Sequence, residues 1–194
     1  MPGWMPYCVT PLRRMASGVV FCMLGSVAAA SVAAQTPQEA AAINMQLAIQ
    51  LCVENYRTPQ KMRPAFEAAG FEYQPERFSA EEVVHWYVAP ADTMVAQVDP
   101  GPGRSFCAIS SNLMSVGSAS AFARAVFERW FAGAIQIGSP QGEFIAPGTP
   151  QAANRACTGF HVFAPQRLIW VQIGNAGQDP LCIEDGTAQI IIQM

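Results

Sequence analysis

The first 34 residues have the pattern of a segment that is removed, which restricts the fold to the rest of the chain. Arg13 and Arg14 precede an uncharged stretch, residues 15–34, that is apolar in its middle and ends in small side chains. This order predicts a secretory signal peptide at residues 1–34. The alternative is an uncleaved membrane anchor, because about 20 apolar residues can span a bilayer. Gly, Ser and Ala dilute the second half of the stretch and favour the signal peptide.

The expected cleavage point follows Val32, Ala33 and Ala34, whose short side chains suit the positions before a cleaved bond. Cleavage a few residues earlier is the alternative. The mature protein is then expected to be a single domain at residues 35–194, located in the periplasm or outside the cell. No stable membrane span is expected after cleavage.

The cysteines of the expected mature chain predict disulfide bonds. An even number of cysteines in an exported chain favours cross-links, and four cysteines allow three pairings. Their spacing fits neither a CxxC redox motif nor a zinc-ligand set. Four buried free thiols in a reducing compartment are the alternative. The four residues are Cys52, Cys107, Cys157 and Cys182.

Three helices are expected. The first begins with a capping box at residues 36–39 and carries Cys52 on its apolar stripe. The second spans about residues 58–70. The third is amphipathic and spans residues 118–133, with Ser118 as its expected N-cap.

Runs of β-branched and aromatic residues predict strands in two groups, separated by turns that contain proline or glycine. Together with the helices they predict an α+β fold, in which an antiparallel β-sheet packs against helices. The first group is 83–88, 93–99 and 106–109, and the second is 155–164, 167–173 and 187–194, with short candidates at 135–137 and 143–145.

The two groups of strands resemble each other and suggest a duplicated helix-plus-three-strand unit. The alternative is convergence: proline turns between apolar strands can have similar sequences without a duplication. If each unit cross-links itself, the disulfides are Cys52–Cys107 and Cys157–Cys182. The matches at one constant offset are Ala89-Pro90 with Ala164-Pro165, Gln97 with Gln172 and Cys107 with Cys182, while His85 and His161 match one residue out of step.

The charge balance argues against nucleic acid as a partner. The formal net charge is −3, and loss of Arg13 and Arg14 with the signal peptide makes it −5. Such a surface does not attract phosphate backbones. The sequence has no phosphate-binding loop between a strand and a helix, and no zinc-ligand spacing, so no cofactor or metal is predicted.

No catalytic residue can be assigned from the sequence. His85 and His161 both lie between apolar residues of expected strands, where a histidine without a carboxylate partner more often has a structural role. The acidic pairs at residues 81–82 and 184–185 are adjacent along the chain. Adjacent residues of a strand point to opposite faces, so neither pair predicts an acid–base dyad.

The alternation in residues 167–173 places Leu168 and Trp170 opposite the buried face. Either another segment of the chain covers them, or they form a contact surface for a partner or a second copy of the chain. The hypothesis for function is a non-enzymatic envelope protein that binds a protein or small ligand through its sheet. The alternative is a small hydrolase or other enzyme using His85 or His161 with a nearby carboxylate.

Overall fold

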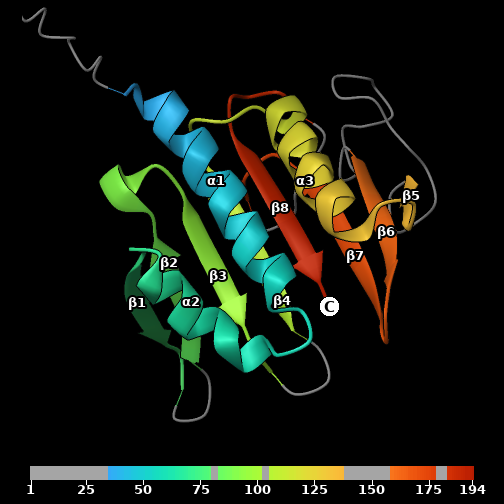
Figure 1. Cartoon of the computed structure of the whole chain (residues 1–194). Coiled ribbons are helices and arrows are strands. Elements are labelled where there is room, and N and C mark those ends of the chain that lie inside the picture. Colours follow the sequence, from blue (N-terminus) through green and yellow to red (C-terminus); the bar gives the residue numbers. More distant parts are fainter. Residues whose placement is uncertain (1–34, 80–82, 102–104, 138–157, 178–182) are drawn as a thin grey trace, which may run out of the picture. The chain divides into compact units, whose positions relative to one another are not determined.

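An antiparallel sheet of eight strands forms the centre of the described fold (Figure 1). The structure, a computed structural model, describes residues 35–79, 83–101, 105–137, 158–177 and 183–194. The predicted signal peptide, the candidate strand at 143–145 and the predicted Cys157–Cys182 pair lie outside these residues. No helix in the described part of the chain is both long and apolar enough to cross a bilayer.

The described residues of the first half form two α-helices and four strands. Short 3-10 turns at Pro59–Lys61 and Pro90–Asp92 precede the second helix and the third strand. The elements are α1 (Pro37–Glu54), α2 (Met62–Ala68), β1 (Glu72–Arg77), β2 (Val83–Val88), β3 (Val95–Asp99) and β4 (Phe106–Ser111).

The second half repeats this order with one long helix and four strands among its described residues. The three α-helices and the antiparallel sheet confirm the predicted α+β class. The elements are α3 (Val116–Phe131), β5 (Ile135–Ile137), β6 (Thr158–Ala164), β7 (Arg167–Gly174) and β8 (Ala188–Gln193).

The sheet order is β1-β2-β3-β4-β8-β7-β6-β5, so two meanders of four strands meet at β4 and β8. This agrees with a duplicated unit, but each unit has four strands instead of the expected three. The constant offset does not hold either. Val88 pairs with Val95 in the first hairpin, whereas Ala164 pairs with Arg167 in the second, so the second connection is shorter.

The starts of the two long helices show which capping predictions hold. Thr36 Oγ1 accepts a hydrogen bond from the Glu39 amide, and Glu39 Oε2 accepts one from the Thr36 amide, which confirms the capping box. The prediction of Ser118 as the N-cap of α3 is wrong. Ser115 is the N-cap and its hydroxyl accepts from the Ser118 amide. The helix begins earlier because the buried Val116 belongs to its first turn.

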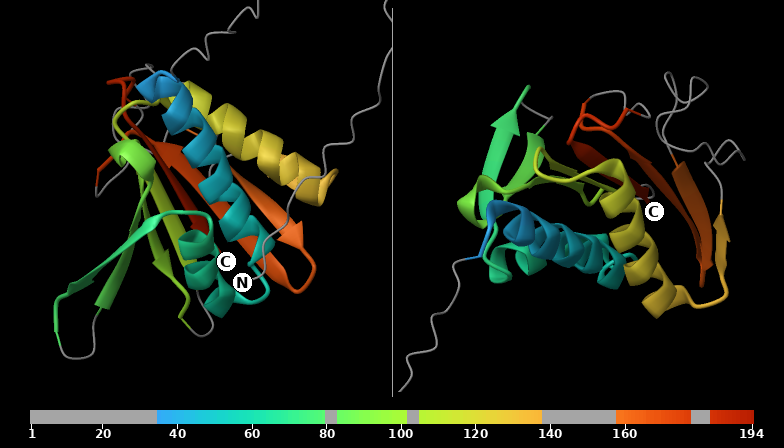
Figure 2. Two further views of the ribbon diagram at one scale, coloured as in Figure 1. Left: turned by 60° about the vertical axis from the view of Figure 1, so that its left-hand side comes forward. Right: turned by 90° about the horizontal axis from the view of Figure 1, so that it is seen from above.

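All three helices lie on one face of the sheet, and Figure 2 shows α1 and α3 side by side there. The core lies between the helices and this face. Alternation predicted its strand residues correctly, since the inward side chains of β3 and β7 are buried. These side chains are Ala96 and Val98 on β3, Met94 just before it, and Ile169, Val171 and Ile173 on β7.

A disulfide between Cys52 and Cys107 joins α1 to β4, as one of the expected pairings requires. The two Cα atoms are 6.4 Å apart, and both residues are fully buried. The bond therefore fastens the helix layer to the middle of the sheet from inside the core.

We expect the Cys52→Ala/Cys107→Ala double variant to lose stability. The bond closes a loop with a sequence separation of 55 residues. A loop of this length corresponds to about 4 kcal/mol of unfolding free energy in the chain-entropy model. Urea unfolding followed by tryptophan fluorescence measures the difference, and the wild type with dithiothreitol should match the double variant. Equal unfolding midpoints with and without the bond would contradict this expectation.

Candidate functional site

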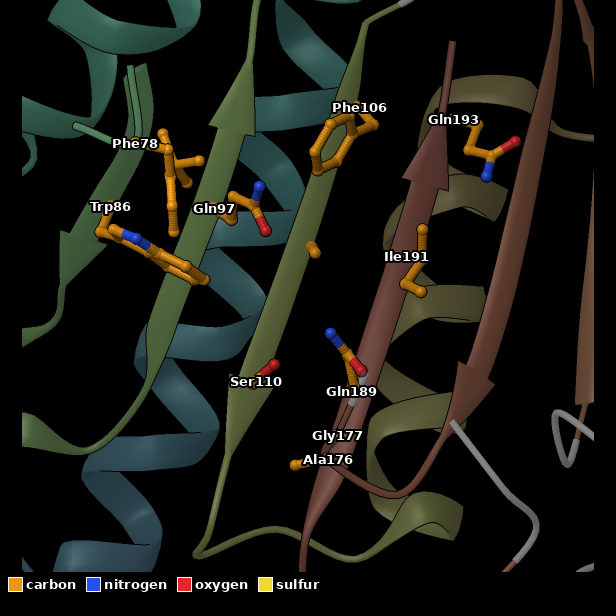
Figure 3. A pocket seen from close by; sticks show the side chains of 12 residues that line it. Phe78, Trp86, Gln97, Phe106, Ser110, Ala176, Gly177, Gln189, Ile191 and Gln193 are labelled. Atoms are coloured by element: carbon orange, nitrogen blue, oxygen red, sulfur yellow. The ribbon is translucent and has the colours of Figure 1, made fainter. Parts of the chain in front are cut away.

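The sheet face opposite the helices, here called the open face, contains a cavity lined by described residues. Its volume is about 750 Å³. Figure 3 shows side chains from β2, β3, β4 and β8 around it, with Phe78 after β1 and Ala176 and Gly177 after β7 at its margins. We call this cavity the open-face pocket.

Small side chains between large ones create the open-face pocket. Ala108 and Ser110 on β4 lie opposite Ile191 and Gln189 on β8. The short side chains of Ala108 and Ser110 form the floor of the pocket. Aromatic side chains stand around this floor. The apolar lining is Phe78, Val84, Trp86, Phe106, Ala108 and Ile191, and the polar side chains are Gln97, Ser110, Gln189 and Gln193.

None of the described lining residues is charged. The charges nearby belong to neighbouring strands and already have partners. Glu76 Oε2 accepts a hydrogen bond of 3.0 Å from Trp86 Nε1, and Asp99 Oδ1 accepts one from the Gly101 amide. The bond to Glu76 fixes the Trp86 indole, whose ring lines the pocket (Figure 3).

Gln189 contributes an unpaired polar atom to the pocket. Its side-chain oxygen, Oε1, is buried and has no hydrogen-bond partner among the described residues. A buried acceptor without a partner costs free energy that a paired one does not. A rotation of the Gln189 side chain toward the pocket would bring this oxygen within reach of a ligand that donates a hydrogen bond, which would remove that cost.

The predicted contact residues Leu168 and Trp170 lie on the same open face, outside the pocket. They are 40% and 37% exposed, so the described residues leave part of both side chains open. Phe163, the cross-strand partner of Leu168, is also exposed. Gln193 on β8 pairs with Phe106 on β4 and with Trp170 on β7. These three residues form a row that connects the pocket to the exposed residues. Their role as a contact surface stays a prediction.

The two histidines lie on opposite faces of the sheet. His161 is on the open face, and its ring meets the edge of Trp170 at 5.7 Å between centroids. His85 shares the helix side of β2 with the buried Tyr87. Neither ring has a hydrogen bond to a carboxylate in the described part of the chain. The sequence comparison matched the two histidines with a shift of one residue. A shift of one residue along a strand moves a side chain to the other face of the sheet, so the match did not show that the histidines lie on different faces.

His85 belongs to a polar cluster between α2 and the first two strands. Arg63 Nη2 donates to Tyr73 Oη over 3.1 Å, and Tyr73 Oη lies 2.8 Å from His85 Nδ1. Arg63 Nε also donates to Tyr87 Oη. The Tyr73 hydroxyl can thus accept from the guanidinium and donate to a neutral imidazole.

Burial lowers the pKa of His85 below its usual range. The nearby charge of Arg63 lowers it further, and Asp99 acts in the opposite direction. The cluster therefore favours the neutral imidazole. It faces the helices, so it is separate from the open-face pocket.

Sequence reasoning missed the open-face pocket. The alternation that assigned Leu168 and Trp170 to the open face also assigns Gln97 there, and in residues 187–194 it separates Gln189, Ile191 and Gln193 from the buried positions. That pattern was the available signal. The step that the sequence did not show is the pairing of β4 with β8, which brings the lining together.

In the described part of the chain, no group of three or more His, Cys, Asp or Glu side chains is placed to hold a metal ion. The comparisons with known proteins add no family to this description. No family model, no curated protein and no solved structure matches the chain.

Replacing Gln189 with a side chain of similar shape should raise stability. Gln189→Met removes the unpaired oxygen, so we expect a gain of about 1 kcal/mol in unfolding free energy without ligand. The matched control is Gln172→Met, on the open face of β7 outside the pocket, with an expected change below about 0.5 kcal/mol. Urea unfolding measures both, and a loss of stability in Gln189→Met would contradict this account.

The lowered pKa of His85 predicts a dependence of stability on pH. Below about pH 6.5 the unfolded chain binds a proton that the folded state resists, so the unfolding free energy should decrease from pH 7.5 to pH 5.5. His85→Asn keeps a polar atom toward Tyr73 but does not titrate, and we expect a smaller decrease in this variant. Urea unfolding at several pH values measures the slope. Equal slopes for the two proteins would be inconsistent with a lowered pKa.

Proposed function

We propose that this protein is a non-enzymatic binding module of the cell envelope that takes a small uncharged ligand in the open-face pocket. The observation that carries the proposal is the pocket itself, about 750 Å³ in volume, whose described lining is uncharged and includes a residue with a buried acceptor unpaired within the described part of the chain. Its volume lies in the range of sites that enclose small organic ligands.

The chemistry of the lining supports binding over catalysis. Ser110 has the one hydroxyl among the described lining side chains, which include no histidine, carboxylate or lysine. A serine nucleophile needs a base within hydrogen-bond reach. The enzyme alternative required a carboxylate close to His85 or His161, and neither ring has a hydrogen bond to a carboxylate among the described residues. Binding is therefore the function that this arrangement favours.

Two observations support a place in the envelope. The pattern of residues 1–34 is that of a secretory signal peptide, and the Cys52–Cys107 disulfide suits an oxidising compartment. Export remains part of the proposal.

Filling the pocket tests the proposal directly. Ala108 lies on the floor, and the Ala108→Phe variant would occupy the space above it without entering the core. The probe is the uncharged fluorophore N-phenyl-1-naphthylamine, titrated into the purified protein. We expect saturable enhancement of its fluorescence in the wild type and at least tenfold weaker binding in the variant.

The matched control is Gln172→Phe, which adds the same ring on the same face beside Ile191 but outside the pocket lining. It should bind the fluorophore like the wild type. Unchanged binding in Ala108→Phe, or no saturable binding to the wild type, would contradict the proposal.

A further inference from the structure

We infer that the ligand of the open-face pocket is an uncharged saccharide, and that longer saccharide chains extend from the pocket to Trp170. This inference rests on the proposed function and specifies the class of ligand. Three properties of the described residues lead to it: the charge around the pocket, the hydrogen-bonding side chains inside it, and the positions of the aromatic rings.

The charges exclude an anionic ligand. The described lining is uncharged, and the neighbouring acids Glu76 and Asp99 lie on β1 and β3. Asp99 pairs directly with Phe106 of the lining. A phosphate or carboxylate would lose its hydration without gaining a cation and would meet these acids at the rim. The described lining itself has no carboxylate to pair with a cationic ligand.

The polar side chains of the lining suit hydroxyl groups. Gln97, Gln189 and Gln193 each carry both a donor and an acceptor, as each sugar hydroxyl does. Gln189 Oε1 is buried and has no partner among the described residues, and a rotation of this side chain toward the pocket would let a sugar hydroxyl donate to it. A hydrocarbon chain would leave that oxygen and the other amides without hydrogen bonds in a dry site.

The aromatic side chains provide flat apolar surfaces. The hydrogen bond from Trp86 Nε1 to Glu76 fixes the indole before a ligand arrives, and Phe106 lies two strands away. A sugar ring presents a face of C–H groups that packs on an aromatic ring while its hydroxyls point sideways. Fixed rings flanked by amides therefore suit a pyranose better than a flexible chain.

Trp170 provides a second aromatic surface outside the pocket. Phe106, Gln193 and Trp170 form a continuous row across β4, β8 and β7, and neighbouring strands are about 4.8 Å apart. Trp170 is therefore about 10 Å from the Phe106 end of the pocket along this row. A short sugar fits the pocket alone, whereas a longer chain reaches Trp170.

Isothermal titration calorimetry with the purified full chain tests the ligand class. The probes are the disaccharides and tetrasaccharides of cellulose, starch and chitin, with tetragalacturonate as the anionic comparison. We expect at least one uncharged tetrasaccharide to bind and tetragalacturonate not to bind. Ala108→Phe should reduce the affinity for the bound sugar at least tenfold.

Chain length tests the role of Trp170. In Trp170→Ala we expect about tenfold weaker binding of the tetrasaccharide and unchanged binding of the matching disaccharide. Trp130→Ala, the same substitution at an exposed tryptophan of α3 on the other side of the sheet, is the matched control and should leave both affinities unchanged. An equal affinity of wild type and Trp170→Ala for the tetrasaccharide would refute the extension to Trp170.

The two proposals fail in different ways. If none of the uncharged saccharides binds but N-phenyl-1-naphthylamine binds and is excluded by Ala108→Phe, the ligand class is wrong and the proposed function stands. If neither the saccharides nor the fluorophore binds, both proposals are wrong. Tighter binding of tetragalacturonate than of its uncharged counterparts would also overturn the saccharide assignment, because it contradicts the charge argument.

Discussion

The pairing of β4 with β8 is the interaction on which the rest of the fold depends. It joins the two halves into one sheet, and Ser105 and Met194 extend it with two further backbone hydrogen bonds of 3.0 and 2.8 Å. The floor of the open-face pocket lies across this seam. Neither half provides that floor alone, because Ala108 belongs to the first half and Ile191 to the second. The proposed binding site is thus a product of the joined sheet.

The two faces of the sheet have different roles: the helix side stabilises the fold, and under our proposal the open face binds the ligand. The helix side contains the packed core and the Cys52–Cys107 bond, while the open face carries amides and a buried oxygen that lowers stability without a ligand. Sites that bind ligands commonly retain such unfavourable groups, because optimising stability would remove the groups that bind. Gln189 is such a group under our proposal.

Local patterns predicted the parts of this fold that depend on neighbouring residues. The capping box at Thr36 and the buried faces of β3 and β7 follow from spacing alone, and the structure confirms them. β1 was missed because its residues, Glu72–Arg77, are polar and largely exposed. The pocket was missed because it depends on contacts between β4 and β8, which are distant along the chain. The spacing of apolar residues along a strand predicts which face of the sheet each side chain lies on, but it does not predict which strand is the neighbour.

The two outer strands have a consequence for how other molecules can attach. β1 has Pro75 in its middle, which cannot donate a backbone hydrogen bond, and β5 is only three residues long. Both margins of the sheet are therefore poor templates for an added strand, which is the usual route to polymerisation and to capture of extended peptides. The apolar strand β8, which would be hazardous at a margin, lies in the interior of the sheet order. Lateral growth into fibres is therefore disfavoured at both margins of the described sheet.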